Sequence, residues 1–200
     1  MSKKEFVQSE RLYTVNLLKS LTNRQWHAAT LCKGWDVGDI AAHLVARERS
    51  VYSDVGLIIE SLHYVHDKKI SRIKARGQSY ILSKLAHYPW WMPAVANVAE
   101  FYVHNEDILR GNLKMRRTKP NKEAGEILWQ ALRGLVKIRR ELVADLGNVQ
   151  LENIETGAVL TIPNKTAQKD TIIAGLPGEL LLFFYGRRNA AKVKITTTKI

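Results

Sequence analysis

The stretch NVAEFYVHNEDILRG, residues 97–111, places a carboxylate and an imidazole one helical turn apart. On a helix, Glu100 and His104 project from the same side, about 40° apart at ~100° per residue. Phe101 and Ile108 beside them turn that side toward a core. Burying a carboxylate there is costly unless something positive or polar compensates it. An arginine, a solvent-filled cleft or a metal ion would each do so.

A second imidazole stands at the edge of another apolar stripe. His43 lies beside Ile40 and Leu44 in KGWDVGDIAAHLVARERSVY, which has helical spacing. If the two helices are neighbours, His43, Glu100 and His104 converge. Two imidazoles and one carboxylate suit a borderline divalent ion, and three protein ligands leave one coordination position open. From spacing alone, a helical Glu–His pair satisfied by ordinary hydrogen bonds is the more frequent case.

Apolar residues at helical spacing predict four strong helices, the pattern of an antiparallel bundle. These helices cover 4–20, 36–51, 97–111 and 123–147, and a weaker helical pattern covers 57–77. Asp36 is expected to cap the second helix, with Trp35 and Ile40 as a hydrophobic staple. Gly111 is expected to end the third helix in a left-handed conformation, and Gly147 to end the fourth.

After residue 147 the composition shifts to short segments rich in β-branched residues. Strands are expected at 149–154, 159–163, 170–175 and 191–197, with a helix over 176–187. The predicted fold class is therefore mainly α. It consists of a helical bundle over 1–147 followed by a small α+β domain over 148–200.

The composition favours a cytoplasmic protein. The single cysteine, Cys32, excludes an internal disulfide framework. No apolar run approaches the ~20 residues of a membrane helix, and the N-terminus has no apolar core of the signal-peptide kind. We therefore expect no membrane contact.

Basic residues are spread along the chain, whose net charge is +12. The densest run, KMRRTKPNK at 114–122, is predicted to be a loop because it contains a proline and follows Gly111. A nucleic-acid contact there is the least favoured function, because no aromatic stacking surface accompanies the loop. Its contacts would be made by Lys114, Arg116, Arg117 and Lys119.

Two segments resemble the signature motifs of a metal-binding family. LCKGWDVGDIAAHLVARE (31–48) and NVAEFYVHNEDILRG (97–111) look like motifs of the actinobacterial group related to mycothiol-dependent maleylpyruvate isomerases, in the DinB-like four-helix-bundle superfamily. GLPGELLLFFYGR (175–187) resembles the end of that family, where a small α+β domain follows the bundle. The resemblance implies that three residues bind a divalent metal, most readily Zn²⁺, with water completing the site. These are His43, Glu100 and His104.

The resemblance also implies a thiol cosubstrate, since the related isomerases use mycothiol. The metal would hold its sulfur as a thiolate, so the catalytic group would be a metal-bound water or thiolate. Asp107 is expected to orient a ligand histidine. Arg187 is either a donor to a ligand carboxylate or a helix-end arginine that stabilises the dipole. The chain is shorter than a typical isomerase and is similar to a compact branch characterised only as metal-binding.

The favoured function is a metal- and thiol-dependent transferase or isomerase that acts on a small electrophile. The second hypothesis is a non-catalytic, metal-stabilised binding or stress protein, in which the ion is coordinatively closed. A basic nucleic-acid-binding module is the third.

Overall fold

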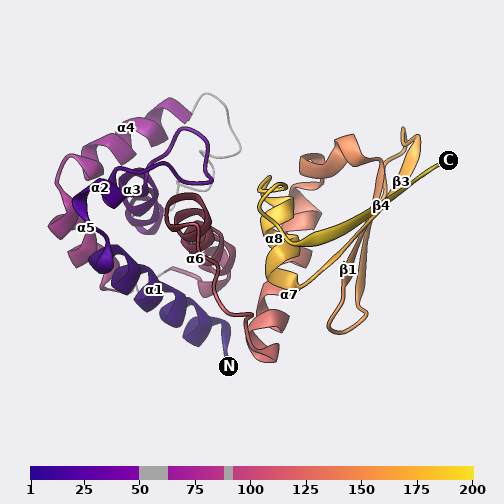
Figure 1. Cartoon of the computed structure of the whole chain (residues 1–200), viewed down its shortest axis with the longest axis horizontal. Helices are drawn as coiled ribbons and strands as arrows, with labels where there is room; N and C mark the ends of the chain where they lie inside the picture. Colours follow the sequence, from indigo (N-terminus) through magenta and orange to yellow (C-terminus); the bar gives the residue numbers. More distant parts are fainter. Residues whose placement is uncertain (50–62, 88–91) are drawn as a thin grey trace. The chain divides into compact units, whose positions relative to one another are not determined.

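A helical unit and a unit that combines helices with a sheet make up the chain (Figure 1). The computed structural model describes residues 1–49, 63–87 and 92–200. The helical unit spans Ser2–Arg117, and the second unit consists of Thr118–Ile200 together with Met1. None of the described helices is both long and apolar enough to cross a membrane.

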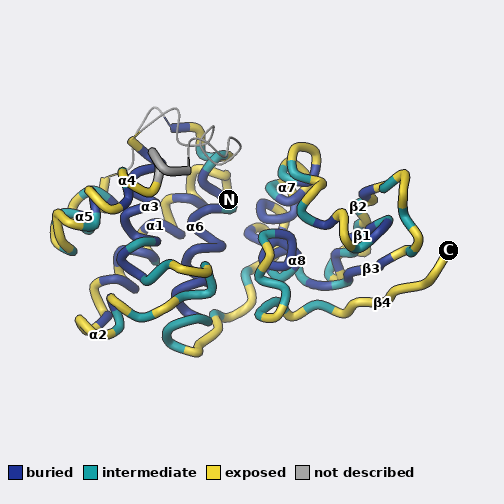
Figure 2. Tube along the Cα trace, turned by 90° about the horizontal axis from the view of Figure 1, so that it is seen from above, coloured by how far each residue is buried: buried dark blue, intermediate teal, exposed yellow. Residues whose placement is uncertain are grey.

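The helical unit is built around α6, which packs against α1 and α3, while α4 and α5 pack on α3. Large side chains of these helices are fully buried, among them Leu18, Ile40, Leu44 and Phe101, and the buried faces line the centre of the unit (Figure 2). The helices are α1 (Lys3–Ser20), α2 (Asn23–Trp26), α3 (Val37–Glu48), α4 (His63–Lys74), α5 (Gln78–Leu85) and α6 (Ala94–Ile108).

A capping side chain and a glycine mark the beginnings of α3 and α5. The predicted cap Asp36 accepts a hydrogen bond from the backbone N–H of Asp39 at 2.8 Å. The weaker pattern over 57–77 contains α4, and residues 57–62 lie outside the described part. The sequence interpretation missed α5, which follows Gly77. That glycine has φ of 83°, a conformation that other residues rarely adopt, so the chain turns between the two helices.

Gly111 has a different role from the predicted left-handed cap. The α6 helix continues into a π-helical turn, η2 (Leu109–Leu113), and the left-handed residue is Lys114, with φ of 55°. A side chain at Gly111 would place its Cβ 2.6 Å from the backbone N of Leu31 and from the backbone C of Thr30. Glycine is therefore required by the close approach of two backbone segments.

Alanine at Gly111 is expected to destabilise the protein by about 1–3 kcal/mol, because the added Cβ forces the two backbone segments apart. The measurement is the thermal unfolding midpoint. Gly134→Ala is the control, since a Cβ at that helical position has nothing within 4 Å and replaces a poor helix former. Equal midpoints for Gly111→Ala and wild type would contradict the close approach.

The second unit places a four-stranded sheet against α8, and α7 packs on α8. The strand order is β2-β1-β3-β4; β1 and β3 are parallel, and the outer pairs are antiparallel. All four predicted strands and the helix between them are confirmed. The elements are α7 (Lys122–Ile138), η3 (Arg140–Leu146), β1 (Asn148–Asn153), β2 (Val159–Ile162), β3 (Lys169–Gly175), α8 (Pro177–Phe184) and β4 (Val193–Lys199).

The division between the units differs from the expected domain boundary at 147/148, because α7 belongs to the second unit. All residues of α8 except Glu179 are apolar, and the helix buries Leu180, Leu181 and Phe183. A helix of this kind needs cover on more than one side. The sheet covers one side, and the stripe of α7 that contains Leu128 and Leu132 packs against the helix as well. The helix predicted over 123–147 is therefore not part of the helical unit.

Candidate metal centre

Three of the predicted site residues come together inside the helical unit. His43 of α3 and Glu100 and His104 of α6 each offer one ligand atom, and these atoms lie within 4.8 Å of one another. All three side chains are buried, with exposed fractions between 2% and 8%. Within the described residues this is the cluster of histidine, cysteine and acidic side chains that has the spacing of a metal site.

One oxygen of Glu100 lies between the two imidazoles. Its Oε2 is 3.3 Å from Nε2 of His43 and 3.6 Å from Nε2 of His104. Two nitrogen atoms and one oxygen atom therefore face a common point from two helices. This donor set matches the preference of a borderline divalent ion, so the residues present fit a metal.

Asp107 occupies the other side of the His104 ring. Its Oδ2 lies 3.0 Å from Nδ1 of His104, and the carboxylate is fully buried. Because an ionised carboxylate only accepts hydrogen bonds, an ionised Asp107 favours the tautomer of His104 with a proton on Nδ1. Nε2 of the same ring lies 3.6 Å from Oε2 of Glu100. The contact expected of Asp107 is present; that it serves to orient a metal ligand stays a prediction.

Burial and charge shift the pKa values of the three residues in different directions. Burial lowers the pKa of His43 to about 4, despite the opposing hydrogen bond to Glu100. Burial would raise the pKa of Glu100, but the charge of Arg47 and the two imidazoles hold that pKa well below its usual value. Burial would lower the pKa of His104, but Asp107 and Glu100 outweigh it and raise this pKa. The surroundings therefore favour the protonated form of His104, which lies between Asp107 and Glu100, and the neutral form of His43.

Arg47 supplies one of the compensations considered for Glu100, and the sequence interpretation did not identify it. Its Nη1 lies 3.6 Å from Oε1 of Glu100, and its Nη2 donates a hydrogen bond to the carbonyl of Ala96 at 2.7 Å. Arg47 follows His43 by one helical turn, so the i,i+4 rule that paired Glu100 with His104 points to it as well.

Glu48, the next residue on α3, belongs to a separate buried ion pair. Arg11 of α1 contacts both oxygens of this carboxylate, once at 2.7 Å, and Nδ2 of Asn97 donates to Oε1 at 2.9 Å. Arg11 and Glu48 are 4% and 5% exposed. Arg47 and Glu48 are thus neighbours on α3 but belong to different ion pairs, Arg47 with Glu100 and Glu48 with Arg11.

Trp35 lies on the candidate metal site. Its ring centroid is 5.0 Å from that of His43 and 6.2 Å from that of His104, and its plane is inclined by 28° to the His104 ring. The loop that carries Trp35 contacts the end of α6, because the N–H of Leu31 donates to the carbonyl of Asp107 at 3.2 Å. The indole expected to form a hydrophobic staple therefore packs against two candidate ligands.

Arg187 lies in the second unit, just after α8. Its Nη1 donates to the carbonyl of Tyr185 at 2.7 Å, and Tyr185 is the C-terminal cap of that helix. This contact is the one expected of a helix-end arginine. A role of Arg187 toward a bound ligand stays a prediction.

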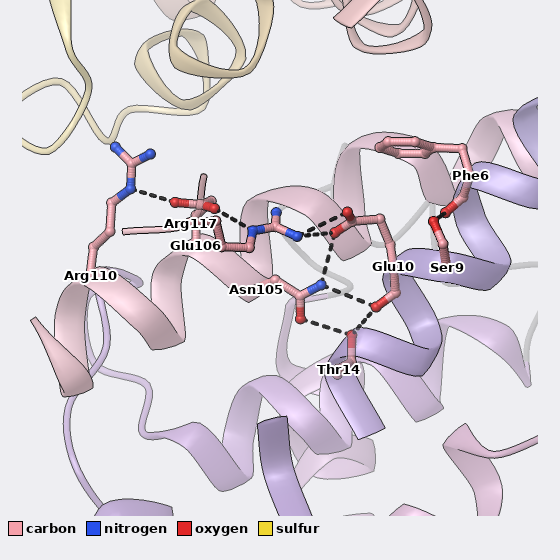
Figure 3. A network of polar contacts seen from close by, with 8 residues as sticks. All are labelled: Phe6, Ser9, Glu10, Thr14, Asn105, Glu106, Arg110 and Arg117. Atoms are coloured by element: carbon pink, nitrogen blue, oxygen red, sulfur yellow. Dashed lines mark hydrogen bonds and ion pairs between the residues drawn. The ribbon is translucent and has the colours of Figure 1, made fainter. Parts of the chain in front are cut away.

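The basic run over 114–122 does not form one exposed surface. Arg117 is turned inward, where Nη1 contacts Glu10 at 2.9 Å and Nε contacts Glu106 at 2.7 Å (Figure 3). Lys119 pairs with Glu155 at 2.6 Å. Lys114 donates a hydrogen bond to the carbonyl of Gly111 at 2.8 Å, so three of the four residues expected to make a nucleic-acid contact have partners within the protein.

Comparisons with known proteins agree with the resemblance seen in the motifs. Residues 7–56, which contain the motif around His43, match the family model of the mycothiol maleylpyruvate isomerase N-terminal domain. Curated proteins give no significant match.

Two solved structures share the fold over nearly the whole chain. A mutant of the mycothiol-dependent maleylpyruvate isomerase, with alanine in place of a histidine, matches with a TM-score of 0.55 and 12% identity, over 98% of this chain and 93% of that chain. Another structure of the isomerase matches with a TM-score of 0.51 and 10% identity, over the same shares. Residues 7–56 are therefore similar to the N-terminal domain of the mycothiol maleylpyruvate isomerase, and the chain shares the fold of the two isomerase structures.

Proposed function

We propose that the protein binds one divalent metal ion, most readily Zn²⁺, through His43, Glu100 and His104. The observation that carries this proposal is the meeting of three buried ligand atoms within 4.8 Å, from two helices. Two imidazole nitrogens and one carboxylate oxygen match the ligand preference of a borderline divalent ion. Three protein ligands leave at least one coordination position for an exogenous group.

The side chains around the site have separate tasks in this proposal. Asp107 holds the His104 ring so that Nε2 faces the ion. Trp35 packs on both imidazoles, which limits their rotation and the access of water. When bound, a divalent ion lowers the pKa of a thiol or water next to it.

We further propose that the exogenous group is a low-molecular-weight thiol, with mycothiol as the first candidate, and that the protein is a thiol-dependent isomerase or transferase. The family match of residues 7–56 supports this. In an isomerase, the sulfur adds to one carbon of a double bond, rotation follows about the resulting single bond, and elimination regenerates the thiol with the other isomer. In a transferase, the adduct of the thiol and a small electrophile is the product.

Calorimetric titration of the zinc-loaded protein with mycothiol tests this proposal. Because a thiol has a pKa near 8.5 and binds a metal as its thiolate, we expect close to one proton released per thiol bound at pH 7. Titrations in two buffers of different ionisation enthalpy measure this release. Metal-free protein is the control and is expected to give no such signal.

A zinc-loaded protein that binds no thiol would instead support the metal-stabilised, non-catalytic alternative. The deep burial of all three ligands, which is typical of structural sites, favours that alternative. Assay of maleylpyruvate isomerisation, with and without thiol, then separates the isomerase from a transferase that uses another electrophile.

A further inference from the structure

We propose that Arg47 is the resident counter-cation of Glu100 and competes with a metal ion for the charge of this carboxylate. The claim that Arg47 competes with a metal ion rests on the proposed metal site. Arg47 would thereby stabilise the metal-free fold, lower the affinity for the ion and keep one oxygen of Glu100 away from it.

The first support is the different surroundings of the two oxygens of Glu100. His43 and Arg47 stand one turn apart on α3 and lie on either side of this carboxylate. Oε2 is 3.3 Å from Nε2 of His43, whereas Oε1 is 3.6 Å from Nη1 of Arg47. An ion placed between the imidazoles therefore meets one oxygen, while the other faces a guanidinium group.

The second support is that Arg47 is held in place. Its side chain is 4% exposed, and Nη2 donates to the carbonyl of Ala96, one turn before Glu100 on α6, at 2.7 Å. Glu48, the neighbouring carboxylate along α3, is already paired with Arg11 and hydrogen-bonded to Asn97. Arg47 thus contacts Glu100, while Glu48 has direct partners of its own.

The consequence follows from Coulomb's law in a buried setting. Without an ion, the guanidinium group offsets the cost of burying the Glu100 charge. With an ion, two cations share one carboxylate and repel each other, and this repulsion is substantial at the effective dielectric constant of a protein interior. Removal of Arg47 should therefore weaken the metal-free fold and strengthen metal binding. A purely structural role would weaken the fold and leave the affinity unchanged.

The test is the dissociation constant for Zn²⁺, measured by competition with a fluorescent chelator. Arg47→Gln is expected to bind zinc about ten-fold more tightly than wild type, and Arg47→Lys, which keeps the charge, close to wild type. Arg11→Gln is the matched control, because it removes a buried arginine of equal exposure that pairs with Glu48; its zinc affinity should stay within two-fold of wild type. Unchanged or weaker zinc binding by Arg47→Gln would overturn the proposal.

Thermal unfolding in the presence of a chelator tests whether Arg47 stabilises the metal-free fold. Arg47→Gln is expected to lower the midpoint, and Glu100→Gln in the same chain to recover part of that loss, because the buried charge is then gone. Additive losses in the double variant would overturn the counter-cation role. If Arg47→Gln folds only with zinc present, the ion has replaced the arginine, as proposed. Failure to fold under both conditions, while Arg11→Gln folds, would contradict it.

These measurements separate the inference from the proposed function. Absence of zinc binding by wild type would refute the metal site as it stands. If Arg47→Gln bound zinc and wild type did not, the result would still support competition between Arg47 and zinc for Glu100. If neither protein bound zinc, the proposed competition would be overturned.

Discussion

Alanine in place of His104 is expected to leave the purified protein without bound metal, where wild type carries close to one ion per chain. His104 offers one of only two imidazole ligands, and its Nε2 lies 3.6 Å from the shared oxygen of Glu100. Its removal leaves one imidazole and one carboxylate, too few to retain a borderline ion through purification. Elemental mass spectrometry on both proteins, after reconstitution with zinc, measures the difference.

His87→Ala is the matched control for this experiment. His87 lies in the same unit, is exposed, and contacts the carbonyl of Ser83 through Nδ1 at 2.8 Å. This variant should keep its metal. Equal metal contents of His104→Ala and wild type would place the ion elsewhere, and the absence of metal from wild type after reconstitution would refute the proposed site.

Alanine at Glu106 is expected to cost about 3 kcal/mol of unfolding free energy, the lower end of the range for breaking a buried ion pair. The carboxylate is 1% exposed and accepts from Nε of Arg110 at 2.5 Å and from Nε of Arg117 at 2.7 Å (Figure 3). Without Glu106, Arg110 and Arg117 each lose a carboxylate to which their guanidinium groups donate. Arg117 keeps Glu10 and its stacking on Tyr13, 4.7 Å away, which limits the loss.

Chemical denaturation followed by far-ultraviolet circular dichroism measures this effect. Asp67→Ala is the control, because Asp67 is an exposed carboxylate on α4 of the same unit and surface substitutions usually change stability by about 0.5 kcal/mol or less. A loss for Glu106→Ala as small as that of the control would show that the network in Figure 3 contributes little. Metal content should stay near wild type, since Glu106 is not among the three ligands.

Local signals were sufficient for most of the secondary structure. Apolar periodicity predicted α1 and α3, the Asp36 side chain predicted where α3 begins, and β-branched segments predicted all four strands. The weaker helical pattern was expected to end at Gly77, but α5 after it was missed because its eight residues are too few for a clear periodic signal. The grouping of His43, Glu100 and His104 was also predicted. The i,i+4 spacing placed Glu100 and His104 on one face, the apolar stripe placed His43 at the edge of a core, and the motif resemblance pointed to the same three residues.

The partners of each buried face depended on the tertiary structure. Periodicity shows which side of α7 is apolar, but it does not say whether that side packs on the helical unit or on α8, and α8 is the partner observed. The sequence analysis explained the glycine at position 111 by a left-handed backbone conformation. The structure explains it by the close approach of the backbone of Thr30 and Leu31, which are far away in the sequence.

Buried charges depended most strongly on long-range contacts. The cost of burying Glu100 could be inferred from the amino-acid sequence alone, and a cation could be expected there. That Arg47 faces one oxygen while two imidazoles face the other follows from the packing of α3 on α6. A buried charge in the sequence indicates that a partner is needed. The identity and distance of that partner are determined only when helices far apart in the sequence pack together.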